Sequence, residues 1–579
     1  MSHGSLFERL VAYLEQLYPK LDAHQLARQC LYQMELDFEV TTPSAHNNSW
    51  DQSDCWLISY GDSILKSGEK PLSTLHGFIE AQLAETVSGV HILPFFPYSS
   101  DDGFSVIDYY SVNDSLGDWN DIRAIGERWD LMADLVINHC SARSGWFENF
   151  RHNRDPGRGF FKCADPSWDL SQVVRPRTND LLQSYTSVDG ERWLWCTFSR
   201  DQVDLDFENP QVLLEFLAII RHYLNHKVRI FRLDAIAFVW KIPGTNCLNL
   251  AQTHTLVRLL RLLVEHAQPN AVIITETNIP NRENLSYFGN ANEAHGIYNF
   301  ALPPLLLHTL ISGDASHLSN WAMAMPPAQN GTFFLNFIAS HDGIGLRPVE
   351  HILDEAETQT LINTMQGFGG RISWRNLSEQ RVKPYEINIS LFDALKGTAK
   401  GVDSHQLARF ICAHCIMLSL EGIPAIYIHS WLATGNDYHK LQHSQHNRAI
   451  NRHRWQADQL ESALADTDSH HAKALTALKR LVGIRQHQSA FHPNATQYTL
   501  QLGKHLFGIW RQSLDRRQSV FAIHNVSSQT QSLPLSEINL TELDQWTDLL
   551  SQQSIDPSQK SLQLAPYQSV WLTNLANPA

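Results

Sequence analysis

Eight short apolar segments, rich in β-branched and aromatic residues, recur along most of this 579-residue chain. They alternate with stretches of helical periodicity, and each is almost continuously apolar, which is typical of parallel strands buried on both faces. Eight strands alternating with helices favour a closed (β/α)8 TIM barrel over an open doubly wound sheet. The expected strands lie at 55–61, 89–95, 131–138, 228–235, 271–277, 296–302, 333–340 and 423–430.

A chain of this length exceeds one compact core, so we expect further units around the barrel. Two intervals between expected strands are too long for simple crossovers, and long insertions after strands commonly build binding walls. The chain begins with a helical pattern and ends with short alternating strands. The expected division is a helical N-terminal extension at 1–50, the barrel at 51–455 with insertions at about 140–205 and 343–405, a helical connector at 456–496 and a C-terminal β domain at 497–579.

The overall charge and the cysteines limit the classes of partner. The formal net charge is −15 without a basic stripe, which argues against nucleic acid. The N-terminus lacks the basic start and apolar core of a signal peptide, and no apolar run approaches the roughly 20 residues of a membrane span. We therefore expect a cytoplasmic protein without a membrane partner. Eight cysteines do not suggest a disulfide framework, and Cys412 and Cys415 lie in a pattern typical of a buried helix face.

Polar and charged residues cluster where four of the expected strands end. A charged group beside an apolar strand is costly unless it is paired or used in function. In a parallel barrel these ends converge on one face, where barrel enzymes have their active sites. The residues are Asp134, Asn138, His139, Arg232, Asp234, Glu276, His341 and Asp342.

This residue set is compatible with a metal site or with glycosyl transfer by paired carboxylates. The absence of HxH or HExxH spacing disfavours the metal site, so we expect no metal and no cofactor. Arg232, two residues before Asp234 on the same strand face, is expected to keep Asp234 ionised. Glu276 has no cationic neighbour in sequence and is expected to keep a raised pKa, as a general acid requires.

The segments DLVINH, FRLDAIAF, ITETN and ASHDGIG resemble the four conserved regions of the α-amylase superfamily, glycoside hydrolase family 13. The resemblance covers roughly residues 50–455. It implies a retaining double displacement, with Asp234 as nucleophile, Glu276 as general acid/base and Asp342 as transition-state stabiliser. It also implies that Arg232, His139 and His341 hold the glucosyl ring.

Further segments resemble the sucrose phosphorylase subfamily: SYGDSI, VHILPFFPYSSDDGFSVIDY, YNFALPPLLLH, SHDGIGLRP and NRAINRH. That resemblance implies that Asp101 and Arg448 close a dead-end pocket for one glucosyl unit, with Phe104 as an aromatic wall. The alternative is that Asp101 is an ordinary turn residue, because SSDDG is a favourable turn sequence.

The acceptor side departs from simple sucrose phosphorylases. Arg177, in RPRTND, matches the phosphate and acceptor loop, although it could instead be a surface arginine paired with Asp180. Glu386 follows Tyr385 at a position where glutamine is common. These features resemble the glucosylglycerol and glucosylglycerate phosphorylase branch. Glu386 is expected to accept hydrogen bonds from hydroxyls and to disfavour a nearby carboxylate.

The expected activity is therefore that of a retaining α-glucoside phosphorylase, which transfers glucose from a small glucoside to inorganic phosphate as co-substrate. Glucosylglycerol is the first expected donor, followed by glucosylglycerate and sucrose. A family 13 hydrolase is an alternative, because water competes with phosphate for the same intermediate. A non-catalytic sugar-binding protein is the alternative from another class, and the intact carboxylate set argues against it. The sequence carries no signal for an oligomeric state.

Overall fold

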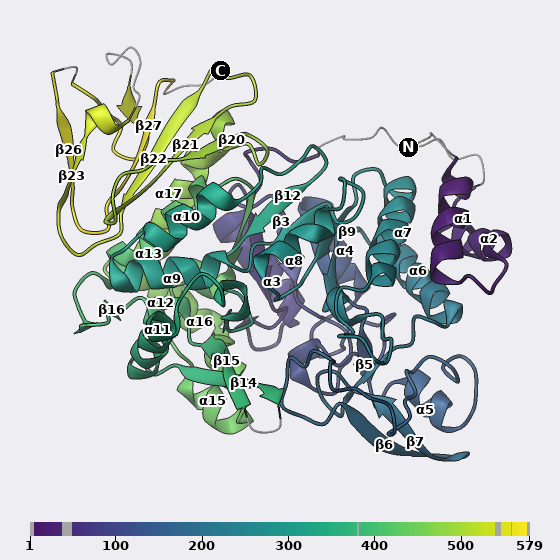
Figure 1. The fold of residues 1–579 in the computed structure, drawn as a ribbon. Coiled ribbons are helices and arrows are strands. Elements are labelled where there is room, and N and C mark those ends of the chain that lie inside the picture. Colours follow the sequence, from purple (N-terminus) through teal and green to yellow (C-terminus); the bar gives the residue numbers. More distant parts are fainter. Residues whose placement is uncertain (1–4, 38–48, 379–380, 539–545, 557, 576–579) are drawn as a thin grey trace.

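The computed structural model describes residues 5–37, 49–378, 381–538, 546–556 and 558–575. Its centre is a closed barrel of eight parallel strands, as the sequence predicts, and each strand overlaps one of the eight apolar segments (Figure 1). The last strand closes the barrel against the first. In barrel order the strands are β1 (Trp56–Ser59), β3 (Gly89–Ile92), β4 (Asp130–Val136), β9 (Val228–Asp234), β10 (Val272–Thr275), β11 (Gly296–Tyr298), β12 (Phe333–Asn336) and β18 (Ile423–Tyr427).

Helices shield the outside of the barrel, which explains why its strands are apolar on both faces. The local sequence sets where these helices begin. Asn209 caps α6 by accepting a hydrogen bond from the backbone N–H of Gln211, and Pro210 occupies the first turn. The main covering helices are α3 (Pro71–Leu83), α4 (Trp119–Arg128), α6 (Pro210–Asn225), α7 (Ala251–Ala267), α9 (Leu302–Ser312) and α13 (Gln406–Ser419).

The first expected insertion follows β4 and contains two small antiparallel sheets beside helix α5 (Gly145–Arg151). One sheet pairs β5 (His139–Ser141) with β8 (Gln202–Asp204). The other pairs β6 (Leu182–Ser187) with β7 (Gly190–Trp195). The first of these sheets therefore connects the insertion to His139 at the end of a barrel strand.

The second expected insertion follows β12. It contains α11 (Glu355–Gly367) and a three-stranded sheet in the order β13 (Ile344–Gly345), β15 (Arg381–Asn388) and β14 (Arg371–Ser378). The pairing of Gly345 with Glu386 brings the middle of this insertion back to the segment that follows Asp342. A chain segment distant in sequence thereby lies at the mouth of the barrel.

Two helices precede the barrel and a β sheet follows it. Helices α1 (Leu6–Leu17) and α2 (Ala23–Gln33) pack against α7 and α6 (Figure 1). Two helices, α16 (Ala457–Ala465) and α17 (His470–Gln486), lead to a six-stranded sheet ordered β20-β21-β22-β27-β24-β25. One face of that sheet belongs to the main core and the other to a second apolar core. The domain limits expected from the sequence remain predictions. The sheet strands are β20 (Thr496–Thr499), β21 (Leu506–Gln512), β22 (Ser519–Asn525), β24 (Thr547–Asp548), β25 (Gln553–Ser554) and β27 (Ser569–Thr573).

Arg485 on α17 connects these parts. Its fully buried guanidinium donates hydrogen bonds to the backbone carbonyls of Gln52 and Asp54 before β1, and of Gly422 before β18. Burial lowers its pKa to about 10, which leaves it charged near neutral pH. Loss of a buried group with several hydrogen bonds is costly, so this side chain stabilises the closure of the barrel.

None of the helices in the described ranges has both the length and the apolar character to cross a membrane. Cys412 and Cys415 are buried on α13, as expected. All eight cysteines are free thiols. Within the described residues, no group of three or more His, Cys, Asp or Glu side chains is arranged to hold a metal ion.

Candidate active site

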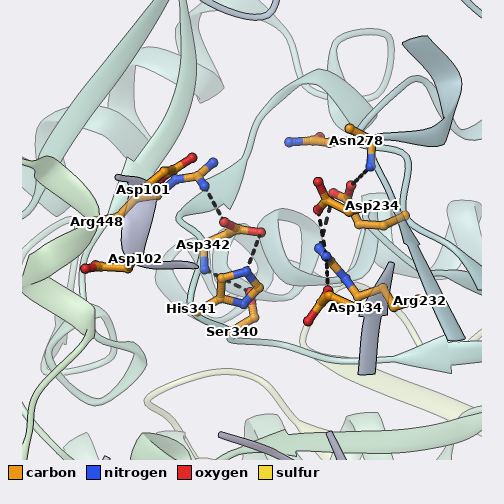
Figure 2. Close-up of polar contacts among 12 residues, drawn as sticks. Asp101, Asp102, Asp134, Arg232, Asp234, Asn278, Ser340, His341, Asp342 and Arg448 are labelled. Carbon is orange, nitrogen blue, oxygen red and sulfur yellow. Dashed lines mark hydrogen bonds and ion pairs between the residues drawn. The ribbon is translucent and has the colours of Figure 1, made fainter. Parts of the chain in front are cut away.

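Five of the eight residues expected at the strand ends line one pocket at the carboxyl end of the barrel, whereas Asp134, Asn138 and Arg232 do not line it. Figure 2 shows several residues of this site. Asp234 ends β9, Glu276 follows β10, and His341 and Asp342 follow β12. Arg232 lies beneath the pocket rather than on its wall. The expected residues that line the pocket are Asp101, Phe104, His139, Arg177, Asp234, Glu276, His341, Asp342, Tyr385 and Arg448.

Arg232 is buried among three carboxylates. Its Nη1 atom lies 2.5 Å from Oδ1 of Asp134 and 2.7 Å from Oδ1 of Asp234, and its Nη2 atom lies 3.8 Å from Oε1 of Glu276. Asp134 also contacts His91, with 2.8 Å between Oδ2 and Nε2. Burial alone would raise the pKa of Asp134, but His91 and Arg232 outweigh it and lower that pKa. Asp134 therefore stays ionised, and its negative charge offsets a large part of the positive charge of Arg232.

Asp234 and Glu276, the two central carboxyl groups, also contact Arg232, whose positive charge Asp134 already offsets in part. Burial raises the pKa of Asp234 to about 7 although Arg232 opposes the shift. Burial, Asp134 and Asp342 outweigh the guanidinium in raising this pKa, while Arg232 favours the ionised form that the sequence analysis expects for Asp234. Burial likewise raises the pKa of Glu276 to about 7, as expected. The shorter contact to Arg232 favours the anion on Asp234 and the shared proton on Glu276.

Glu276 is also held by the backbone, because the N–H of Ala235 donates a hydrogen bond of 3.1 Å to its Oε2 atom. Ala235 has φ of 51°, a left-handed conformation that is uncommon for a residue other than glycine. The turn after β9 thus connects the two central carboxyl groups through adjacent residues. Unusual backbone of this kind occurs preferentially at functional sites.

Arg448 connects Asp342 to Glu386 of the second insertion. Its Nη1 atom lies 2.5 Å from Oδ1 of Asp342 (Figure 2). Its Nε and Nη2 atoms each donate a hydrogen bond of 2.9 Å to Glu386, one to each carboxylate oxygen. Burial would raise the pKa of Asp342, but Arg448 and His341 outweigh it and lower that pKa well below its usual range. Asp342 is therefore an anion near neutral pH.

The expected role of Glu386 in contacting an acceptor is contradicted by this arrangement. Glu386 is 1% exposed and does not line the pocket. Both of its oxygens are bonded to Arg448, so neither is directed at a ligand hydroxyl. Glu386 is a positioning residue for Arg448, and its charge no longer argues against an anionic acceptor.

The opposite side of the pocket combines rings and a strained turn. Phe104 stacks on His341 with ring centroids 5.0 Å apart, and the carbonyl of Phe104 lies 2.9 Å from Nε2 of His139. Burial lowers the pKa of both histidines, so both are neutral near pH 7. Asp101 has φ of 54°, and its Oδ1 atom is buried without a hydrogen-bond partner in the described part of the chain. A polar sugar hydroxyl would satisfy that oxygen.

The acceptor side contains Arg177 and Tyr385. The Arg177 guanidinium lies over the rings of Phe198 and Tyr385, at 6.0 and 5.6 Å from their centroids. Within the described residues Arg177 forms no ion pair, and the charge of Asp180 acts on Arg175 instead. The alternative of a surface pair with Asp180 is therefore not observed, and Arg177 is free to meet an anion in the pocket.

The pocket residues that were not expected from the sequence include Gln202, Asn278 and Arg347. Gln202 donates hydrogen bonds to Asp101 (3.2 Å) and to the carbonyl of Phe104 (3.1 Å), and no sequence signal marks it. Asn278 lies two residues after Glu276, and its Nδ2 atom is 3.5 Å from the Tyr385 hydroxyl. Arg347 lies within the quoted SHDGIGLRP segment, five residues after Asp342. The last two lie beside catalytic candidates in sequence, which is the signal that could have found them.

Comparisons with known proteins agree with this geometry. The catalytic domain profile of α-amylases matches residues 82–342. Three relatives named glucosylglycerate phosphorylase are 37–41% identical to this chain. The one from Allomeiothermus silvanus is 41% identical over 525 residues, which cover 90% of this chain and 91% of the relative. This chain belongs to glycoside hydrolase family 13.

Within family 13 the chain belongs to the sucrose phosphorylase-like group of glucosyl-transferring phosphorylases. The crystal structure of sucrose 6F-phosphate phosphorylase from Thermoanaerobacter thermosaccharolyticum matches with a TM-score of 0.71 at 23% identity. The match covers 82% of this chain and 94% of that one, and it supports the fold. The expectation of glucosylglycerol as first donor is not supported. The glucosylglycerol phosphorylase of Marinobacter adhaerens is 28% identical over 70% of this chain and 82% of the relative.

The position of Glu386 predicts the result of Glu386→Gln in this family 13 enzyme. The variant loses a charged, two-point contact to Arg448, and such bonds contribute about 1.5–3 kcal/mol each. We expect kcat/KM for glucosylglycerate, glucosylglycerol and sucrose to fall by a common factor of about 10 or more, because the family resemblance places Arg448 at the glucosyl unit that the three donors share. Steady-state kinetics on the three donors measures this. Asp403→Asn, which breaks the Asp403–Arg409 pair outside the pocket, is the control. A change in the ranking of the donors would contradict the positioning role.

Proposed function

We propose that this protein transfers the α-D-glucosyl unit of glucosylglycerate to inorganic phosphate, giving α-D-glucose 1-phosphate and glycerate. The observation that carries the proposal is the set of Asp234, Glu276 and Asp342 on one pocket, with Arg177 on the same pocket and unpaired in the described residues. Paired carboxylates suit a retaining displacement at a sugar carbon. A guanidinium without a carboxylate partner suits a phosphate co-substrate.

The first half-reaction uses the two central carboxyl groups. The Asp234 carboxylate attacks C1 of the glucosyl unit from the face opposite the leaving oxygen, while Glu276 gives its proton to that oxygen. The C1–O bond to glycerate breaks as the ester bond to Asp234 forms. Arg232 supports this assignment because it contacts Asp234 at 2.7 Å and Glu276 at 3.8 Å. Asp342, kept anionic by Arg448, stabilises the positive charge that develops on the sugar ring.

In the second half-reaction a phosphate oxygen attacks C1, the ester bond to Asp234 breaks, and the Glu276 carboxylate takes up the proton of the attacking phosphate oxygen. Two inversions give the α anomer. Phosphate approaches a pocket lined by Asp101, Asp234, Glu276 and Asp342, so Coulomb repulsion has to be offset locally. Arg177, held over the rings of Phe198 and Tyr385, is the proposed phosphate ligand.

Glucosylglycerate is favoured as donor by two observations. The three relatives of that name are 37–41% identical to this chain, whereas the glucosylglycerol phosphorylase is 28% identical. In addition, Glu386 is bonded to Arg448, which removes the physical objection to a carboxylate on the leaving alcohol. Hydrolysis through the same glucosyl ester is the competing outcome, because water can replace phosphate.

A donor panel tests the proposal. Glucosylglycerate, glucosylglycerol and sucrose are each incubated with and without inorganic phosphate, and glucose 1-phosphate and free glucose are measured separately. We expect kcat/KM for glucosylglycerate to exceed that of the other two by about 100-fold, and glucose 1-phosphate to be the main product. An equal or better rate on sucrose or glucosylglycerol would reject the donor. Free glucose as main product at saturating phosphate would reject phosphorolysis.

The two raised pKa values predict the pH profile. The first half-reaction needs Asp234 ionised and Glu276 protonated, and each carboxyl has a pKa of about 7. Activity should therefore fall at acid pH as the Asp234 anion is protonated, and at alkaline pH as Glu276 loses its proton. The donor kcat/KM should be bell-shaped around neutrality. Because that ratio reports the first half-reaction in a double displacement, the titration of phosphate does not enter it.

Initial rates at low donor concentration between pH 5 and 9 measure this profile. Glu276→Gln cannot lose a proton, so its residual activity should lack the alkaline limb. A wild-type profile that stays flat across this range would contradict the shared-proton assignment.

A further inference from the structure

Arg347 lies on the pocket wall, on a face that the glucosyl-transfer chemistry does not use. It begins the short 3-10 helix Arg347–Val349, which follows β13. Its pocket neighbours include Tyr385 from β15 and Asn278 from the loop after β10. Tyr385 also lies under the guanidinium of Arg177. Arg347 therefore belongs to the acceptor side, where the leaving alcohol and phosphate bind in turn.

Arg347 differs from the other buried arginines because its guanidinium forms neither a hydrogen bond nor an ion pair with another described residue. Its side chain is 7% exposed, and its Nε atom is buried without a hydrogen-bond partner in the described residues. Glu350 carries a charge nearby, but that carboxylate is bonded to Arg375 at 2.5 Å. Among the buried arginines of the described residues, every other one donates a hydrogen bond to a carboxylate or a carbonyl. These arginines are Arg232, Arg261, Arg375, Arg409, Arg452, Arg485 and Arg511.

An unpaired buried guanidinium is costly for the free protein. Burial lowers the pKa of Arg347, in agreement with a charge that lacks compensation. The cost is removed when an anion of the right size enters the pocket and accepts its N–H groups. A neutral polyol such as glycerol supplies no such anion, whereas a carboxylate matches the planar guanidinium at two points.

We infer that Arg347 binds the carboxylate of the leaving alcohol and selects a small hydroxy acid over a neutral polyol. The inference rests on the proposed function and assigns a specificity residue within it. Arg177 and Arg347 then have separate tasks. Arg177 meets the phosphate, and Arg347, with Asn278 and Tyr385 beside it, meets the carboxylate of the acceptor.

The reverse reaction, in which glucose is transferred from α-D-glucose 1-phosphate to an acceptor alcohol, distinguishes carboxylate binding by Arg347 from phosphate binding by Arg177. With α-D-glucose 1-phosphate as donor, D-glycerate and glycerol are compared as acceptors. In a double displacement, kcat/KM for an acceptor reports the second half-reaction and does not depend on donor affinity. Removing one partner of a buried charged pair weakens binding strongly, so Arg347→Gln should lower kcat/KM for D-glycerate by about 100-fold. The values for glycerol and for glucose 1-phosphate should stay within about threefold. Arg347→Lys, which keeps the charge but loses the two-point geometry, should be intermediate.

Two variants serve as comparisons. Arg177→Ala should produce the reverse pattern, with the larger loss in kcat/KM for glucose 1-phosphate. Arg371→Gln on the exposed part of β14 is the control for removing an arginine from the same insertion, and it should leave the preference for D-glycerate unchanged. Thermal unfolding of each variant confirms that it is folded before the kinetics are compared.

Three outcomes would overturn the inference. Equal losses for D-glycerate and glycerol in Arg347→Gln and Arg347→Lys would indicate a structural role. An equal loss for glucose 1-phosphate would make Arg347 a phosphate ligand. A wild-type enzyme that prefers each neutral alcohol over its acid, for glycerol against D-glycerate and for propane-1,2-diol against lactate, would exclude an acceptor carboxylate altogether. If lactate but not D-glycerate depends on Arg347, the inference stands and the proposed donor fails.

Discussion

The active site depends on one buried guanidinium that serves three carboxyl groups. Arg232 contacts Asp134, Asp234 and Glu276, and a single positive charge cannot compensate three buried negative charges. Asp134 is ionised because His91 and Arg232 both lower its pKa, and its negative charge offsets a large part of the charge of Arg232. The two remaining carboxyl groups are left to share a proton near neutral pH. In the proposed mechanism, this shortage of positive charge makes one of the two similar side chains the nucleophile and the other the acid.

The same shortage of positive charge limits where the rest of the pocket can bind anions. Arg448 brings a second positive charge, but Asp342 and Glu386 bind it on two sides. Additional anions can therefore be accepted only where unpaired cations are available. Arg177 comes from the first insertion and Arg347 from the segment after β12, and both line the pocket. The barrel thus supplies the chemistry of the glucosyl unit, and the insertions supply recognition of the groups exchanged with it.

The sequence predicted the features that depend on local pattern. All eight barrel strands could be located because each is apolar on both faces, and Asp234, Glu276 and Asp342 could be placed because parallel strand ends converge. The predictions failed where partners are far apart in the chain. Glu386 is separated by 62 positions from Arg448, and neither position indicates the pairing that removes Glu386 from the pocket. The pKa of Asp234 depends on burial and on Asp134, 100 positions earlier by their numbers, rather than on its neighbour Arg232 alone.

Trapping of the glucosyl ester tests the central claim, that Asp234 is the nucleophile of a double displacement. With 5-fluoro-α-D-glucosyl fluoride, loss of fluoride drives formation of the ester, while the ring fluorine destabilises the positively charged transition state and slows turnover. Intact-protein mass spectrometry should show one added fluoroglucosyl unit. Peptide mapping should place it on Asp234, Asp234→Asn should remain unlabelled, and added phosphate should shorten the lifetime of the adduct. A label on another residue, or turnover by Asp234→Asn at the wild-type rate, would contradict the account.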